Sequence, residues 1–169
     1  MPVFLDFEAS SLGKNSYPIE VGWVRTDGEG ESLLIKPAEG WTEWDPNAEA
    51  IHNISRQELE DNGVEVTEAC ERVLQLWDGN RVFASAPSWD GHWLSMLLRG
   101  AGYPRHLIRL EDTEVAFAEA AAQRGLRPEE AQAVIEAARA QAAAEPVAHR
   151  AQEDARREWR VWRQVLGQA

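Results

Sequence analysis

Short apolar segments separated by polar turns dominate the first part of the chain. Val3-Phe4-Leu5-Asp6-Phe7 predicts an opening strand, and residues 19–26 alternate between apolar and polar side chains. The turn-forming pair Asp27-Gly28 and a further β-prone segment over 32–36 complete the pattern of a hairpin. We therefore expect a sheet to begin the fold, although the pattern leaves the order of its strands open.

Helical periodicity dominates the rest of the chain, interrupted by shorter strand-like segments. The expected elements are a helix from the capping box at 55–58, a helix through 70–77, a strand over 81–86, a helix over 91–100, a strand over 107–110, and three helices over 112–125, over 128–144 and after 146. This order predicts an α/β fold with a mixed central sheet flanked by helices. No repeat or linker divides the chain, so we expect one domain over residues 1–169.

The overall charge narrows the classes of function. The chain has 29 Asp and Glu residues against 17 Lys and Arg residues, and its net charge is −12. This balance argues against a protein that binds long nucleic acid by bulk electrostatic attraction. It does not argue against an enzyme that holds the end of a strand through bridging metal ions.

Targeting signals are absent from the sequence pattern. The N-terminus lacks the basic and apolar regions of a signal peptide, and no apolar run approaches the roughly 20 residues that a membrane-spanning helix needs. The single cysteine, Cys70, can form no internal disulfide and lies on an apolar helical face, so we interpret it as a core residue. We expect a cytoplasmic protein with no membrane contact.

Asp6 and Glu8 are the first candidates for chemistry. They are two positions apart on the expected first strand, so both side chains leave the same face of the sheet. Two carboxylates that point together repel each other unless a cation lies between them, and carboxylate oxygens suit hard divalent metals. The pair therefore indicates a metal site. The alternative is an exposed strand end with two solvated acids.

A further carboxylate, Asp90, follows the strand expected over 81–86. The carboxyl end of a strand is a usual place for a ligand in α/β sheets, so Asp90 is a second candidate for metal binding. The alternative is that Asp90 caps the N-terminus of the following helix. Its neighbour Trp89 is a candidate for stacking on a nucleotide base.

His149 and Asp154 lie around the start of the last expected helix. Five residues apart on one continuous helix, they would diverge by about 140°. They converge only if His149 lies in the loop or first turn before the helix, and Pro146 permits that. Asp154 borders the apolar stripe of the helix, so its carboxylate faces inward and needs a partner, which a metal would supply. Arg150 is a candidate phosphate ligand.

These motifs together resemble those of the DEDD superfamily of 3′→5′ exonucleases. The residues are Asp6-Phe7-Glu8, then Asp90 after a strand, then His149 with four residues before Asp154. The histidine at this spacing is similar to that of the DEDDh branch, which holds the proofreading exonucleases of DNA polymerases, RNase T and oligoribonuclease. The resemblance covers residues 3 to about 160.

The resemblance implies an RNase H-like fold and a metal-dependent activity. The implied enzyme hydrolyses phosphodiester bonds from the 3′ end of single-stranded RNA or DNA and releases nucleoside 5′-monophosphates. The resemblance also implies that His149 accepts a proton from water and that four carboxylates hold two Mg²⁺ or Mn²⁺ ions, those of Asp6, Glu8, Asp90 and Asp154.

Contacts to the terminal nucleotide are implied by two further segments. The family's first motif commonly has Asp-x-Glu followed by Thr or another small residue and glycine, whereas this chain continues from Glu8 as Ala-Ser-Ser-Leu-Gly. Ser10, Ser11 and Leu12 would supply main-chain contacts and an apolar wedge. The segment Ile51-His52-Asn53-Ile54-Ser55 is similar to the family's Ile-His-Gly-Ile-Thr, with Asn53 in place of the glycine. In this segment His52 and Ile54 would line the nucleotide pocket.

Other interpretations stay open. A non-catalytic nucleic-acid- or protein-binding module on the same fold would use the acidic surface for a basic partner, but it has no physical need for inward carboxylates. A structure-specific endonuclease shares the RNase H-like fold; the His-x₄-Asp spacing favours the exonuclease, but length and charge do not discriminate. Relatives are often homodimers, and the Ala-rich helix over 128–144 is either such an interface or buried within the monomer.

Overall fold

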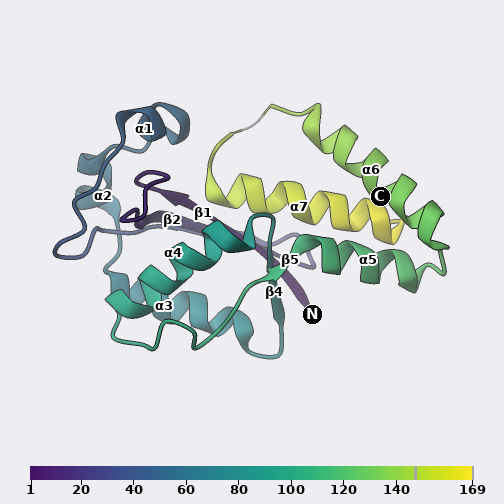
Figure 1. Ribbon diagram of the computed structural model, residues 1–169, viewed down its shortest axis with the longest axis horizontal. Coiled ribbons are helices and arrows are strands. Elements are labelled where there is room, and N and C mark those ends of the chain that lie inside the picture. The colour runs from purple at the N-terminus through teal and green to yellow at the C-terminus, as the bar shows by residue number, and fades with distance from the viewer. Residues whose placement is uncertain (147, 169) are drawn as a thin grey trace.

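A mixed sheet of five strands organises the part of the chain that the structure describes, residues 1–146 and 148–168 (Figure 1). In this computed structural model the strand order is β3-β2-β1-β4-β5. The strands are β1 (Pro2–Ala9), β2 (Pro18–Arg25), β3 (Gly30–Leu34), β4 (Arg81–Ala84) and β5 (Glu111–Asp112). β2 is antiparallel to β1 and β3, whereas β4 is parallel to β1 and β5, so β1 lies at the centre of the sheet.

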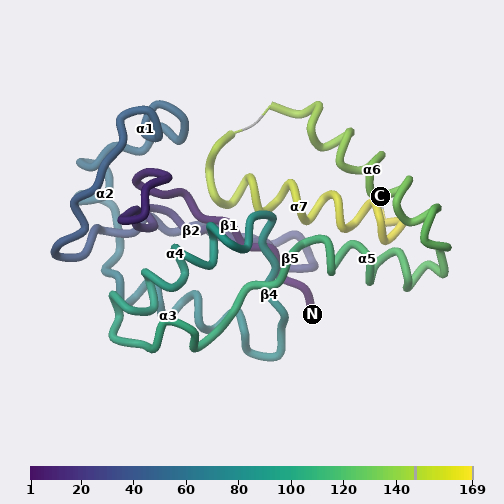
Figure 2. The backbone as a smooth tube through the Cα atoms, in the orientation of Figure 1, coloured from purple at the N-terminus to yellow at the C-terminus, as the bar shows by residue number. Residues whose placement is uncertain are grey.

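Helices cover both faces of this sheet (Figures 1 and 2). Along β1, Leu5 and Phe7 pack in a cluster with α3 and α4, whereas Phe4 packs in a second cluster with α5, α6 and α7. The helices are α1 (Pro46–His52), α2 (Arg56–Asn62), α3 (Val66–Leu74), the 3₁₀ turn η1 (Gln75–Trp77), α4 (Pro87–Gly100), α5 (Thr113–Gln123), α6 (Pro128–Ala143) and α7 (Ala151–Leu166). The arrangement confirms the expected RNase H-like α/β fold.

Most predicted element starts are confirmed at the residues that signal them. The side chains of Ser55 and Asp112 accept backbone N–H groups in the first turns of α2 and α5, and Pro128 is the first residue of α6. Cys70 is fully buried in the core, as expected. Val147, which belongs to the segment expected to lead into the last helix, and Ala169 lie outside the described residues.

Three expected boundaries are wrong. Residues 107–110 form no strand, and β5 is only the pair Glu111–Asp112. Ile108 and Leu110 pack their side chains against the core, so the apolar pattern there reflects burial without strand pairing. The strand expected over 81–86 ends at Ala84, and α4 begins at Pro87 because proline fits a first helical turn, where its missing N–H is not needed.

The apolar face of the Ala-rich helix α6 is used inside the chain. Ala138 and Ala142 are buried in the same cluster as Trp162 and Val165 of α7. This packing accounts for the alanine stripe without a partner molecule, and a homodimer stays a prediction. None of the described helices is both long and apolar enough to span a membrane.

Candidate metal centre

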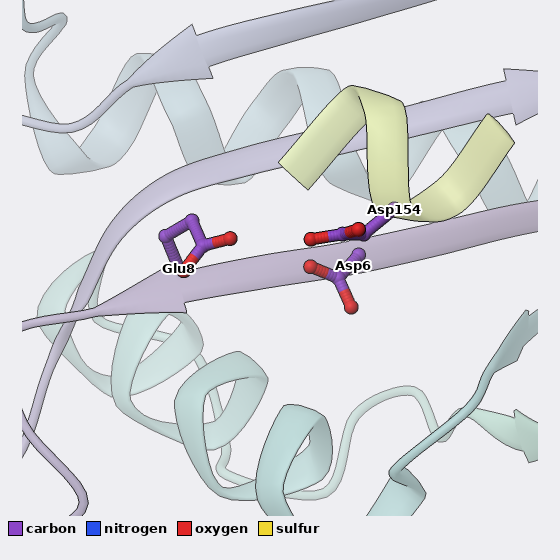
Figure 3. Close-up of side chains that lie close together, drawn as sticks. All are labelled: Asp6, Glu8 and Asp154. Atoms are coloured by element: carbon purple, nitrogen blue, oxygen red, sulfur yellow. The ribbon is translucent and has the colours of Figure 1, made fainter. Parts of the chain in front are cut away.

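Three carboxylates from two elements converge on the face of the sheet that α7 covers. Asp6 and Glu8 share the face of Phe4 on β1, and Asp154 comes from the first turn of α7 (Figure 3). One oxygen atom from each carboxylate lies within 4.8 Å of the others. Residues far apart in the sequence thus form a set of hard oxygen ligands that would suit a divalent cation.

A glycine on β2 lets α7 approach the sheet closely enough to bring Asp154 there. Gly22 lies opposite Asp6 in the β1–β2 ladder. A Cβ atom at Gly22 would lie 2.1 Å from the backbone nitrogen of Gln152, in the first turn of α7. Any side chain at this position would push the N-terminus of α7 away from β1, so the absence of a side chain helps to set the distance between Asp154 and Asp6.

An ion pair with a buried carboxylate anchors the same end of α7. Glu20 on β2 is 1% exposed, and its carboxylate accepts hydrogen bonds from the Arg150 guanidinium, at 2.8 Å from Nη2, and from the backbone N–H of Ala151 at 3.0 Å. The carboxylate also lies at the positive end of the helix dipole. Arg150 is thereby held against the protein, and a contact with a phosphate group stays a prediction for it.

Asp90 reaches the site from the other layer of helices. Its Oδ1 accepts a hydrogen bond of 3.2 Å from the backbone N–H of Phe7, and its Oδ2 is buried without a partner. β4 pairs with β1 only over residues 2–4, so this edge of β1 is free at Phe7. Asp90 lies in the first turn of α4, whose N-cap is Ala86, so the alternative of an N-cap role is wrong.

Burial raises the pKa of every carboxyl in this group, and repulsion from other carboxylates of the group adds to the rise at Asp6 and Glu8. Burial is the main cause at Asp6, followed by the nearby charge of Asp90, and the pKa rises well above its usual range. The pKa of Glu8 rises to about 8 and that of Asp90 to about 7, both mainly through burial. Burial also raises the pKa of Asp154. The group therefore favours a neutral form unless a cation compensates the charge, and the unpartnered Oδ2 of Asp90 also fits a cation.

These shifts predict that the metal-free protein loses stability as the pH rises. The folded-state pKa values of Glu8 and Asp90 lie above the unfolded values of 4.5 and 3.8, so the folded protein binds more protons between about pH 4 and pH 8. Stability is then highest below the unfolded pKa values and falls as the pH passes through 7 and 8. We expect the melting temperature in EDTA to be roughly 5–10 °C lower at pH 8.0 than at pH 5.5, as measured by differential scanning fluorimetry.

The control for this effect is the double variant Glu8→Gln/Asp90→Asn. It removes both titrating groups with little change in shape, so the difference between the two pH values should shrink. Addition of Mn²⁺ at pH 8.0 should restore stability to the wild type and not to the variant. An unchanged pH dependence in the variant would contradict the assignment of the effect to these carboxyls.

His149 lies two residues before α7 and is exposed. Its φ of 48° is in the left-handed region, which side chains other than glycine adopt rarely and often at functional sites. The histidine is close enough to Asp154 for its positive charge to lower that carboxyl's pKa, against the larger effect of burial. Its place in the loop before the helix is the one that convergence with Asp154 requires.

A pocket of about 320 Å³ adjoins Glu8. Its lining includes Ser11, Leu12, Ile51 and His52, and Leu12 is 70% exposed at its rim. The backbone N–H of Ile54 donates to Nδ1 of His52 at 3.0 Å, so Nε2 carries the proton of the neutral ring. This Nε2 is buried, and the nearby Ala9 carbonyl is not in hydrogen-bonding geometry with it. Burial lowers the pKa of His52 overall, although the Ala9 carbonyl acts in the opposite direction.

The structure does not bring all the expected substrate contacts to this pocket. Ser10 is fully buried, and its hydroxyl accepts a hydrogen bond from the backbone of Tyr17. Ile54 is fully buried in a separate apolar cluster, so neither side chain lines the pocket. Trp89 is 41% exposed outside it and stacks on Trp93, with ring centroids 5.7 Å apart.

The departure from the expected glycine at Asn53 has a local explanation. Asn53 ends α1 with a φ of 56°, in the left-handed region. Asparagine is among the few residues that adopt this conformation readily, so it replaces glycine here without disturbing the turn that places His52.

Two acidic residues that the sequence pattern did not single out belong to this region. Glu158 lies one helical turn after Asp154, and its charge contributes to the raised pKa of Asp6. Glu20 is the only acidic residue in an otherwise apolar part of β2. The i, i+4 spacing of Glu158 and the isolated charge of Glu20 were signals that could have found them.

Comparison with known proteins adds independent information on the fold. No protein-family model matches the sequence, and no curated protein matches it. The structure is similar to E. coli exonuclease I in its zinc-bound complex with single-stranded DNA, with a TM-score of 0.66 and 18% identity over 94% of this chain and 38% of that chain. The similarity is one of fold.

Further structures of exonuclease I agree with this. The E. coli enzyme in complex with a dT13 oligonucleotide matches with a TM-score of 0.58 and 20% identity, over 76% of this chain and 30% of that one. The product-bound enzyme matches with a TM-score of 0.57 and 19% identity, over 75% and 33%. The present chain therefore spans about a third of the length of these proteins.

Proposed function

We propose that this protein is a metal-dependent exonuclease that removes nucleotides from the 3′ end of single-stranded RNA or DNA and releases nucleoside 5′-monophosphates. The observation that carries the proposal is the convergence of Asp6, Glu8 and Asp154, with Asp90 close by, beside a pocket open to solvent. The similarity in fold to exonuclease I, crystallised with single-stranded DNA and with product, supports the same class of reaction.

The four carboxylates would hold two Mg²⁺ or Mn²⁺ ions. The support is the raised pKa of all four groups and the unpartnered Oδ2 of Asp90, since both indicate negative charge that lacks a counter-ion. When bound, such ions lower the pKa of water and neutralise charge on the leaving oxygen. They would also remove the repulsion between this acidic site and a phosphodiester, so binding of metal and substrate should be coupled.

His149 would accept the proton of the attacking water. Imidazole is the most common general base in enzymes, and the nearby carboxylate of Asp154 would stabilise the imidazolium that results. The position of His149 in the loop before α7 leaves it free to turn toward a substrate.

The 320 Å³ pocket would hold the terminal nucleotide. Leu12 and Ile51, both exposed at its lining, offer apolar surface to a base, and the ring of His52 lines the pocket beside them. The pocket adjoins Glu8, so a nucleotide in it would present its 5′ phosphodiester to the carboxylates. The chain that continues beyond that phosphodiester would then leave on the other side of the site.

This geometry predicts strict polarity. We expect a 5′-labelled single strand incubated with Mn²⁺ to shorten in steps of one nucleotide on a denaturing gel. A 3′-phosphate should block the reaction, because it adds bulk and charge where the sugar edge docks. A 5′ modification should have no effect. RNA and DNA strands of the same sequence, compared in parallel, would identify the preferred sugar.

A circular single strand separates this proposal from an endonuclease. The circle has no 3′ end and should survive under conditions that degrade the linear form. Cleavage of both forms at similar rates would contradict the exonuclease, and a lack of any hydrolysis with strand binding retained would favour a non-catalytic module.

A further inference from the structure

A second pocket, of about 400 Å³, lies between α4 and the segment that leads to β5. α4 contributes Ser88, His92 and Ser95 to its lining, and the segment contributes Arg105, His106 and Arg109. None of these residues lines the pocket beside Glu8. The polar side chains of this second pocket are cations, imidazoles and hydroxyl groups, with no carboxylate among the residues that line it.

This composition contrasts with the rest of the chain. Residues 91–110 contain no Asp or Glu, although the whole chain has 29 of them and a net charge of −12. Most arginines elsewhere in the described residues pair with acids, as Arg72 does with Glu31 and Arg81 does with Glu111. Arg105 and Arg109 take part in no ion pair within the described residues.

The imidazole of His92 also has a polar atom without a partner among the described residues. Nε2 of His92 is buried and has no hydrogen-bond partner. The segment is tied to η1, because the carbonyl of Arg109 accepts a hydrogen bond from the Trp77 side chain at 3.3 Å. The pocket thus gathers donors and cations, and such a set suits phosphate oxygens rather than a metal ion.

Its position relates it to the candidate metal centre. Ser88 and Asp90 belong to the first turns of α4, and Asp90 points inward to Phe7. Trp93 of the same helix lines the pocket beside Glu8, so the two pockets lie on different sides of α4. A helix is about 10–12 Å across with its side chains, so a strand with its 3′ end at Glu8 would reach the second pocket several nucleotides upstream.

We propose that this pocket binds a phosphodiester of the single strand whose 3′ end occupies the metal centre. The inference rests on the proposed exonuclease function and extends it with a second subsite. Arg105 and Arg109 neutralise the backbone charge, and the hydroxyl groups of Ser88 and Ser95 and the ring of His92 donate hydrogen bonds to it. The subsite makes affinity depend on strand length, because a short strand that fills only the terminal pocket does not reach it.

The test compares the wild type with Arg105→Ala/Arg109→Ala. Binding of a 5′-fluorescein 12-mer and of a labelled dinucleotide is measured by fluorescence anisotropy, with Ca²⁺ in place of Mg²⁺ or Mn²⁺. We expect the affinity of the variant for the 12-mer to fall about tenfold or more and its affinity for the dinucleotide to stay unchanged. The slope of log affinity against log salt for the 12-mer should become shallower by roughly 0.7, because the variant no longer neutralises the phosphodiester in this pocket.

The control variant Arg25→Ala/Arg99→Ala removes two positive charges outside the pocket and should leave 12-mer affinity unchanged. Equal decreases in affinity for both variants, or wild-type affinity that does not rise with strand length, would overturn the proposal. Inorganic phosphate alone, titrated by calorimetry, tests for a small-anion site; saturable phosphate binding that is lost in Arg105→Ala/Arg109→Ala, with equal 12-mer affinity in wild type and variant, would also overturn the proposal. Hydrolysis is assayed separately, so a wild type that binds as expected but degrades no strand would refute only the proposed function.

Discussion

Replacing Asp90 with asparagine is expected to lower nuclease activity by on the order of 10³-fold or more while the fold is retained. The substitution removes charge from a buried candidate ligand but keeps an oxygen that can accept the hydrogen bond from Phe7. It also removes a carboxyl whose pKa burial raises to about 7, so the metal-free variant should melt at a higher temperature than the wild type at pH 8. Activity is measured with a 5′-labelled strand in Mn²⁺, and folding by circular dichroism.

Asp61→Asn provides the matched control, since Asp61 is exposed on α2 and its carboxylate accepts a hydrogen bond only from the side chain of Gln57. This variant should behave as the wild type. EDTA should abolish the nuclease activity of the wild type, and Mg²⁺ or Mn²⁺ should restore that activity. Unaltered turnover in folded Asp90→Asn, or activity that persists in EDTA, would refute the metal assignment.

Replacing His149 with alanine is expected to lower the rate of the chemical step by roughly 10²–10⁴-fold, the usual contribution of a positioned general base. Metal binding should survive, because in the proposed site the carboxylates and not the imidazole would provide the ligands. Single-turnover kinetics measure the first effect and calorimetric titration with Mn²⁺ measures the second.

His106→Ala serves as the comparison, since His106 is also an exposed histidine and lies away from the carboxylates, in the second pocket. Its effect should be limited to the binding of longer strands. If His149→Ala reduced metal affinity as strongly as it reduced turnover, His149 would be a ligand or a structural residue rather than a base.

The acidic character of the protein agrees with separate roles for the candidate metal centre and the second pocket. A net charge of −12 repels nucleic acid over most of the surface, so productive binding depends on local neutralisation. Metal ions at the carboxylates would neutralise charge at the scissile bond, and Arg105 and Arg109 would do so upstream. Selectivity for a strand end then follows from the few places where the surface accepts a phosphate.

Local sequence signals were sufficient for much of the fold. The caps at Ser55 and Asp112 and the proline at Pro128 are short-range features, and each begins a helix where expected. The strand predicted over 107–110 failed because apolar side chains there contact the core without strand pairing. Burial and pairing leave similar patterns in a sequence, and only neighbouring strands distinguish them.

In the candidate site, too, local patterns predict some features and tertiary packing decides others. Strand alternation alone places Asp6 and Glu8 on one face, and the loop position of His149 follows from its spacing to Asp154. The sequence pattern could not predict that Ser10 and Ile54 are buried, because their exposure depends on residues that pack over them from other parts of the chain.

The sequence by itself determined which residues are candidates for the chemistry and which faces of their elements they occupy, because periodicity and capping act over a few residues. Only the tertiary structure decided the distances. The approach of Asp154 to β1 depends on the missing side chain of Gly22 and on the buried Glu20 at the start of α7, both more than a hundred residues away in the chain. The reach of Asp90 to Phe7 depends on where β4 stops pairing with β1. Such distances arise from long-range packing between elements, and no local pattern encodes them.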